Sequence, residues 1–284
     1  MSRLEEDPTR PPPARHAPAF QDTAVAAAPD RSVSANDVGF LQPAHGNASK
    51  RLGRRFGGHP PFVVFALTLL AGYLAMAALA IGLGFLLVDV LVPIHTVGHS
   101  DNAVNDWFAS HRSGSLDDAS YVASSIGDIP FIPALVIVTV LGAALLRRWR
   151  VAAFMAGAIL VEVATYRVAS LVVHRDRPAV PRLDDLPVNQ SYPSGHVAAS
   201  VVVYVGLALL ISSRLRSGRS QALLWAFALA LPLVVALSRM YRGMHHPLDV
   251  SAGVLVGVGS IAIALFATRA AVEAARRRSE RGRA

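Results

Sequence analysis

Six long segments of this chain carry almost no charged residues, and they limit its fold more than any other feature. Residues 62–88 contain no charge over 27 positions. Similar apolar segments follow at residues 129–146, 151–173, 197–213, 221–238 and 250–268. A helix needs about 20 mostly apolar residues to cross ~30 Å of hydrocarbon. We therefore predict an all-α, polytopic membrane protein with a bundle of six transmembrane helices.

The segments around this bundle have a different composition. Residues 1–57 are rich in proline and charge and lack apolar periodicity, so we expect a disordered cytoplasmic tail. Residues 58–270 would form the six-helix membrane domain, and residues 271–284 a basic cytoplasmic tail. The chain contains no cysteine, which excludes disulfides, zinc–thiolate sites and thiol catalysis.

The distribution of Lys and Arg predicts the orientation of the helices. Sixteen of the 27 Lys and Arg lie in the segments on one side of the predicted bundle, and six lie on the other. Positive charge gathers on the cytoplasmic side, so we expect a multi-pass plasma-membrane protein with both termini inside. The net charge of +8 is then explained by residues that face lipid headgroups. Membrane lipids are the expected partners, nucleic acid is not, and the oligomeric state stays open.

Five of the six outer arginines lie in two short segments on the predicted outer side, residues 174–196 and 238–249. Two of them, Arg177 and Arg239, can clamp a tetrahedral oxyanion with paired hydrogen bonds. Ser194 and Gly195 directly precede a predicted helix, whose free N–H groups and dipole favour an anion. The two segments therefore predict an oxyanion-binding site that faces outward.

The same segments contain a possible nucleophile. Asp249 follows His245 by four residues and falls in the first turn of the next predicted helix. It is placed to accept a hydrogen bond from one ring nitrogen of His245 and to leave the other nitrogen nucleophilic. His196 then remains as the acid for a leaving group.

These residues resemble the type 2 phosphatidic acid phosphatase superfamily, the lipid phosphate phosphatases, over about residues 60–270. Three motifs carry the resemblance, namely Arg177-Pro178, Pro193-Ser194-Gly195-His196, and Ser238-Arg239 followed by His245 and Asp249. The resemblance implies that His245 attacks phosphorus and that Asp249 orients it. His196 would protonate the departing oxygen and then activate water. Arg177, Arg239, Ser194 and the Gly195 N–H would hold the phosphoryl oxygens, without metal or cofactor.

One position departs from the family pattern. The first motif usually has Lys seven residues before the Arg of Arg-Pro, and this chain has Ser170 there. Our hypothesis is that Arg167, one turn deeper in the helix, or Arg175, in the loop, supplies the missing cation. A long Arg side chain can extend toward the interface.

The sequence leaves three functions open. The first is a phosphatase for phosphatidic acid, phosphatidylglycerol phosphate, a polyprenyl diphosphate or a polyprenyl-phosphoryl sugar phosphate. The second is a phosphotransferase in which an alcohol replaces water, and the third is a non-catalytic lipid-binding or transport protein. Two smaller questions also stay open. Glu162 either pairs with Arg167 or Tyr166 or lines a path, and residues 95–128 either cover the mouth of the site or simply connect two helices.

Overall fold

The structure is a computed structural model that describes residues 38–43, 47–128, 130–185 and 190–283. Residues 1–37 of the predicted tail lie outside the described residues. Helices make up the regular structure of the described part, apart from one isolated bridge between Asp176 and Gln190. Their bounds are η1 Gly39–Leu41, α1 Ala48–Arg55, α2 Pro61–Phe85, η2 Leu86–Leu91, α3 His95–Ser110, α4 Gly114–Ser125, α5 Phe131–Leu145, α6 Trp149–Val172, α7 Gly195–Ser200, η3 Val201–Val205, α8 Gly206–Ser212, α9 Gly218–Tyr241 and α10 Pro247–Arg281.

All six predicted apolar segments form helices. Five helical stretches are long and apolar enough to span a membrane: α2 with η2, α6, α7 through α8, α9 and α10. The sixth, α5, has 15 residues. At 1.5 Å per residue it is about 22 Å long, shorter than a full hydrocarbon core. The prediction of an all-α, multi-pass membrane protein is confirmed, with a shorter helix at the second apolar segment.

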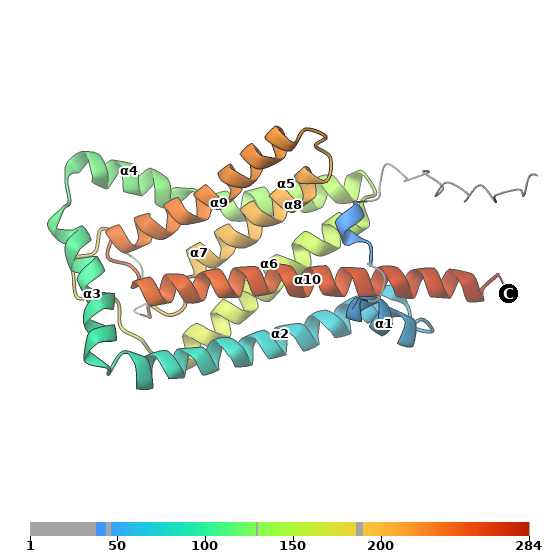
Figure 1. Cartoon of the computed structure of the whole chain (residues 1–284), viewed down its shortest axis with the longest axis horizontal. Helices are drawn as coiled ribbons and strands as arrows, with labels where there is room; N and C mark the ends of the chain where they lie inside the picture. The colour runs from blue at the N-terminus through green and yellow to red at the C-terminus, as the bar shows by residue number, and fades with distance from the viewer. Residues whose placement is uncertain (1–37, 44–46, 129, 186–189, 284) are drawn as a thin grey trace, which may run out of the picture. The chain divides into compact units, whose positions relative to one another are not determined.

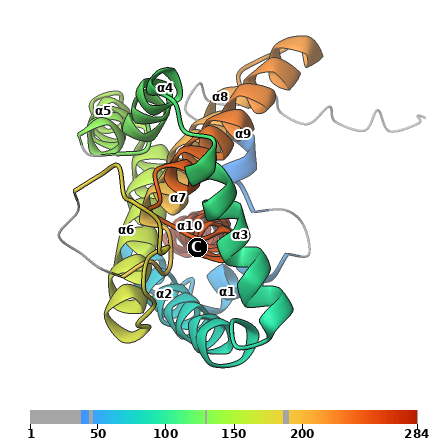
Figure 2. The same cartoon turned by 90° about the vertical axis from the view of Figure 1, so that its left-hand side faces the viewer.

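The helix α10 packs along α2 and α6 and also contacts α7 (Figure 1). Viewed along its axis, α10 has α2, α6 and α7 around it (Figure 2). Its buried face consists largely of small residues, including Gly253, Gly257, Ala264 and Ala267. Small side chains let helix backbones approach closely, which is how helices associate in lipid. A Cβ on Gly257 would lie 2.7 Å from Cβ of Val201, so this contact requires glycine.

The segment before residue 58 differs from the prediction of disorder. Residues Ala48–Arg55 form α1, whose N-cap Asn47 accepts a hydrogen bond from the Ser49 backbone N–H. Ser49, Lys50 and Gly53 are buried, and α1 packs against α10. Tertiary packing on α10 stabilises this short helix, which periodicity over the preceding residues did not reveal. At the other end, α10 remains helical through Arg281, so most of the predicted C-terminal tail continues the helix.

The helices α3 and α4 lie between the first and second apolar segments, and α3 contacts both α9 and α10. The loop segments 173–185 and 190–194 and the α9–α10 connection meet at this end of the bundle, which we call the active-site end. The α1 helix and the last turns of α10 lie at the opposite end, which we call the basic end (Figure 1). The two ends differ in their charged residues, as described below.

Candidate active site

The α9–α10 connection places His245 at the active-site end. The helix α9 ends at Tyr241, and Gly243 adopts a positive φ of 71°, a backbone conformation that favours glycine. A side chain at Gly243 would also lie 2.9 Å from Val180, in the neighbouring loop. The chain then turns into α10, which has His246 as its N-cap and Pro247 in its first turn. His245 is held between two helix ends and is buried.

A hydrogen bond of the His245 ring determines which ring nitrogen carries the proton. Nδ1 of His245 lies 2.7 Å from the backbone carbonyl oxygen of Ser191. A carbonyl oxygen only accepts hydrogen bonds, so Nδ1 donates and Nε2 holds the lone pair. Burial lowers the pKa of His245 well below its usual value, and the charge of Arg239 lowers it further. The ring is therefore neutral at physiological pH, as a nucleophile requires.

Asp249 does not make the hydrogen bond to His245 that the sequence predicted. Its carboxylate accepts hydrogen bonds from the His246 backbone N–H at 2.8 Å and from the Ser191 hydroxyl. It also pairs with Arg175. The physical reason is competition, because a carboxylate in the first turn of α10 is captured by the free N–H groups there. Asp249 reaches His245 indirectly, by holding Ser191, whose carbonyl oxygen holds the ring.

Arg175 is occupied by two carboxylates. Its guanidinium pairs with Asp101 on α3 and with Asp249 on α10, and its side chain is 8% exposed. This arrangement contradicts Arg175 as the replacement for the missing lysine cation, because its charge is already balanced. Arg167 is exposed and lines a cavity beside His196. Ser170 is buried and donates to the Arg167 carbonyl oxygen at 3.1 Å.

Arg239 and Ser194 carry donors that have no partner among the described residues. Arg239 is 1% exposed, yet its Nε and Nη2 atoms lack a hydrogen-bond acceptor. The hydroxyl of Ser194 is also buried and unpartnered. Buried polar groups are nearly always satisfied, so unsatisfied donors of this kind indicate an absent anion or water. Both residues were predicted to hold an oxyanion.

The other predicted phosphate ligands lie near these donors. Arg177 donates from Nη1 to the Met244 carbonyl oxygen at 2.6 Å, directly before His245. Burial, followed by the charge of Arg239, lowers the pKa of Arg177 from its usual value. Gly195 begins α7, and a Cβ there would lie 3.0 Å from the Tyr166 ring. Close packing of α10 on this turn also requires Gly253, where a Cβ would lie 2.5 Å from the Ser194 carbonyl oxygen.

His196 lies on the first turn of α7, and its Nε2 atom is 3.1 Å from the Asp128 carboxylate. The charge of His196 adds a smaller contribution to the lowering of the His245 pKa. A cavity of about 500 Å³ extends from His196 between α5, α6 and α7. Its polar lining includes Glu162, Tyr166 and Arg167, and its apolar wall includes Ile132, Pro133, Val136, Ile137, Ile159 and Val163. Glu162 makes no ion pair with Arg167 among the described residues, so that alternative is not observed, and its buried Oε2 has no hydrogen-bond partner there.

Three further residues that no sequence motif indicated also shape the site. Asp184 accepts from Arg239 at 2.8 Å and pairs with Arg242, so its carboxylate occupies one nitrogen of the predicted clamp. Burial alone would raise the pKa of Asp184, but the hydrogen bond from Arg242 and the charge of Arg239 hold it below its usual value. Asn105 donates to the His245 carbonyl oxygen at 3.0 Å. Asp101 accepts from the Leu248 backbone N–H at 3.0 Å.

These contacts answer the question about residues 95–128. The helix α3 is not a plain connector, because Asp101 and Asn105, one turn apart, bind the His245 loop and the start of α10. A polar pair at this spacing inside a segment with apolar residues was the available signal. In the part of the chain that the structure describes, no group of three or more His, Asp or Glu side chains is arranged to hold a metal ion.

Comparison with known proteins finds a family to which part of this chain is similar. Residues 149–272, which include every predicted catalytic and phosphate-binding residue, match the family model described as "PAP2 superfamily". This segment is similar to the PAP2 superfamily, and we call it the PAP2 domain. The structure of the chain also resembles the solved PAP2-type phosphatidylglycerolphosphate phosphatase of Bacillus subtilis. The TM-score is 0.56 at 20% identity over 70% of this chain and 92% of that one, so the fold is shared.

Two curated relatives match part of this chain at similar identity. Undecaprenyl-diphosphatase of Sulfolobus acidocaldarius is 33% identical over 38% of this chain and 48% of its own length. Decaprenylphosphoryl-5-phosphoribose phosphatase of Mycobacterium tuberculosis is 34% identical over 40% of this chain and 59% of its own length. The chain therefore aligns with about half the length of each relative.

Proposed function

We propose that the PAP2 domain hydrolyses the phosphate or diphosphate group of a membrane lipid through a phosphohistidine on His245. One observation carries this proposal. Arg239 and Ser194, predicted as phosphate ligands, present buried donors without partners among the described residues. A tetrahedral phosphoryl group would satisfy them, and arginine is well suited to paired contacts with phosphate oxygens.

The chemistry follows from the proton positions at the site. Nε2 of His245 attacks phosphorus, forms an N–P bond and breaks the bond to the lipid oxygen, which takes a proton from His196. In the second half His196 accepts a proton from water, whose oxygen displaces the His245 nitrogen and releases phosphate. Donors that are already fixed in place stabilise the charge on the phosphoryl oxygens in both steps.

Two side chains act through the histidines in this scheme. Asp128 accepts from Nε2 of His196 and orients its ring. Asp249 fixes Ser191, and the Ser191 carbonyl oxygen fixes the His245 ring. A neutral carbonyl acceptor leaves His245 neutral before attack. We therefore propose Asp249 and Asp128 as positioning residues.

The cavity beside His196 supports a lipid substrate. One end carries His196 and Arg167, and the rest is lined by apolar side chains of α5 and α6. A phosphate at the histidines would let an apolar chain follow this wall toward the hydrocarbon. The charge distribution of the sequence favours an extracytoplasmic site. The names of the two curated relatives make polyprenyl phosphates and diphosphates the first substrates to test.

The experiment measures phosphate release by the purified protein in detergent with a chelator present. The panel contains undecaprenyl diphosphate, a polyprenyl-phosphoryl sugar phosphate, phosphatidylglycerol phosphate and phosphatidic acid. We expect release from at least one lipid, and a loss of at least about 10⁴-fold in His245→Ala. The matched control is His99→Ala, since His99 is an exposed histidine on α3. Undiminished release by His245→Ala contradicts the proposal, and turnover only with an added alcohol replaces hydrolysis by phosphotransfer.

A further inference from the structure

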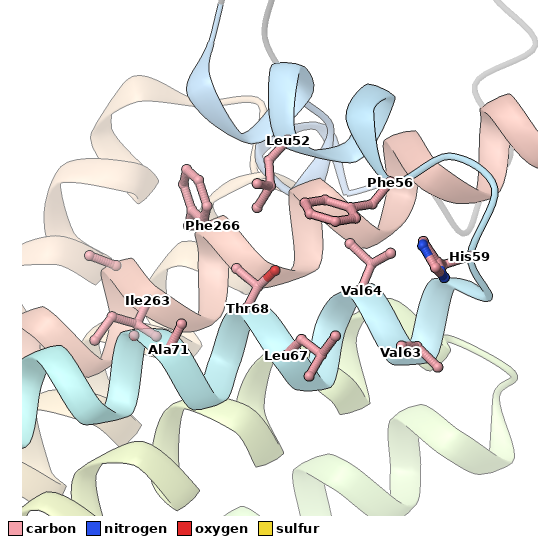
Figure 3. Close-up of a pocket in the computed structure, with 12 residues that line it drawn as sticks. Leu52, Phe56, His59, Val63, Val64, Leu67, Thr68, Ala71, Ile263 and Phe266 are labelled. Carbon is pink, nitrogen blue, oxygen red and sulfur yellow. The ribbon is translucent and has the colours of Figure 1, made fainter.

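A large apolar hollow lies at the basic end, away from the candidate active site. It has a volume of about 770 Å³ and lies between α1, α2 and α10. Figure 3 shows its lining side chains facing a common space, with Leu52 and Phe56 from the α1 side and Leu67 and Val64 from α2. The lining residues are Leu52, Phe56, His59, Val63, Val64, Leu67, Thr68, Ala71, Gly72, Ala262, Ile263 and Phe266.

The length of this groove matches one leaflet of a bilayer. Its α2 wall runs from Val63 to Gly72, which is about 14 Å at 1.5 Å per residue. Half of a hydrocarbon core measures about 15 Å. The end of the groove toward the middle of α2 is closed, because Gly72 lies directly against Ile263 of α10. Leu67 and Ala71 are exposed, so the groove is open along its side, where a lipid chain can enter from the membrane.

The end of the groove nearest α1 carries unbalanced positive charge. Residues 47–60 contain Lys50, Arg51, Arg54 and Arg55 and no carboxylate. Arg54 is already paired with Glu273 of α10. Arg51 and Arg55 are exposed, and neither has an acidic partner within the described residues. They lie on the outward face of α1, next to the side that carries Leu52 and Phe56.

We propose that this groove is a binding site for an anionic phospholipid of the surrounding bilayer. One acyl chain occupies the apolar groove beneath α1, and Arg51 and Arg55 bind the phosphate of the headgroup. An exposed basic residue at a membrane surface attracts anionic lipid, and two of them next to one chain site give headgroup preference. This site lies at the end of the bundle opposite His245, so it is separate from the proposed catalytic site.

The proposed lipid site is consistent with the distribution of residue types on the faces of α1. On α1, Ser49 and Gly53 face α10, Leu52 and Phe56 face the groove, and the arginines face outward. A Cβ on Gly53 would lie 2.5 Å from the Ala270 carbonyl oxygen, so α1 is held directly against α10. The helix therefore forms a fixed edge over the groove. A bound lipid would bridge α1 and α2 and stabilise both.

The test places a fluorescent reporter in the groove. Trp107, Trp149 and Trp225 are replaced by Phe, and Phe56→Trp supplies the single tryptophan. The protein is reconstituted in phosphatidylcholine vesicles with increasing fractions of phosphatidylglycerol or phosphatidylcholine whose acyl chains are brominated. We expect half-maximal quenching at a phosphatidylglycerol fraction about tenfold lower than for phosphatidylcholine. Equal quenching by the two lipids overturns the proposal.

Two further variants separate a built site from general surface charge. Arg51→Gln with Arg55→Gln should remove the headgroup preference, whereas Arg216→Gln with Arg219→Gln, two exposed arginines near the α8–α9 turn, should keep it. Equal loss in both pairs contradicts the site. Native mass spectrometry of the unaltered chain with the same unlabelled lipids covers failure of the reporter variant to fold. Retention of phosphatidylglycerol in preference to phosphatidylcholine supports the proposal, and retention of neither, or a second copy of the chain instead, overturns it.

Discussion

The active-site end and the basic end of the bundle are both rich in arginine but hold it in opposite ways. At the active-site end, Arg175, Arg239 and Arg242 are 9%, 1% and 5% exposed, and each contacts at least one carboxylate. At the basic end, Arg51 and Arg55 are exposed, and even the paired Arg54 side chain is 51% exposed. A buried guanidinium must be balanced by an anion, whereas an exposed one is solvated or faces headgroups. Burial therefore separates the arginines that carboxylates hold at the active-site end from the exposed arginines at the basic end.

The largest difference between the two ends should appear when one buried and one exposed arginine are each removed. We expect Arg239→Ala to lower kcat/KM by about 10²–10³-fold or more, because it deletes preformed donors for the phosphoryl oxygens. Arg216→Ala, at the opposite end, should change kcat/KM by less than about twofold. Steady-state phosphate release measures both. Equal effects of the two variants would contradict the assignment of Arg239.

Arg175 tests whether a buried arginine at the active-site end is structural. Arg175→Gln leaves Asp101 and Asp249 without their cation, so we expect it to destabilise the protein by about 3 kcal/mol or more. Arg167→Gln, at an exposed position, should leave stability within about 0.5 kcal/mol. Denaturation in detergent micelles gives both values. An Arg175→Gln protein of normal stability that has only a raised KM would restore Arg175 as a phosphate cation.

A substitution at Asp184 tests whether its carboxylate competes with phosphate for Arg239. Asp184→Asn weakens the hold on Nη1 of Arg239, so inorganic phosphate should inhibit turnover at a concentration several-fold lower. The matched control is Asp185→Asn, at the adjacent position in the loop. Inhibition constants for phosphate measure the difference. Unchanged or weaker inhibition in Asp184→Asn would show that the carboxylate supports the clamp instead of competing with it.

The pH dependence gives the smallest expected effect. The positive charge of Arg177 lowers the pKa of His245. Removing it in Arg177→Gln makes protonation of His245 easier, so the pKa of His245 rises. Because only neutral His245 is nucleophilic, the acidic limb of kcat/KM should move to higher pH, by up to about one unit. Arg182→Gln, an exposed position in the same loop, should leave the limb in place. A shift to lower pH would contradict this electrostatic arrangement.

The sequence predicted the helices of the bundle, and it placed the candidate site residues, whose roles stay a prediction, in recognisable motifs. Uncharged length marks a membrane helix, and Ser194, His196, Arg239 and His245 stand in motifs whose spacing is set by helix ends. The predicted spans differ from the structure mainly at α5, which is only 15 residues long.

What the sequence could not show depends on contacts between distant segments. The Ser191 carbonyl oxygen, not Asp249, holds His245, because the free N–H groups at the start of α10 and Arg175 capture the Asp249 carboxylate. Asp184 reaches the site from a loop, and no local pattern marks this approach. The packing of α1 was missed for the same reason, since it is stabilised by α10, more than 200 residues later.

The proposed phosphohistidine on His245 is tested most directly by trapping and locating the covalent intermediate. The protein is quenched rapidly during turnover of a lipid substrate with labelled phosphate, and the labelled peptide is sequenced under alkaline conditions that preserve phosphohistidine. We expect labelled phosphate on His245, and no labelled peptide from His245→Ala under the same conditions. Label on another residue, or steady turnover of unmodified protein with no trapped intermediate and undiminished activity in His245→Ala, would contradict it.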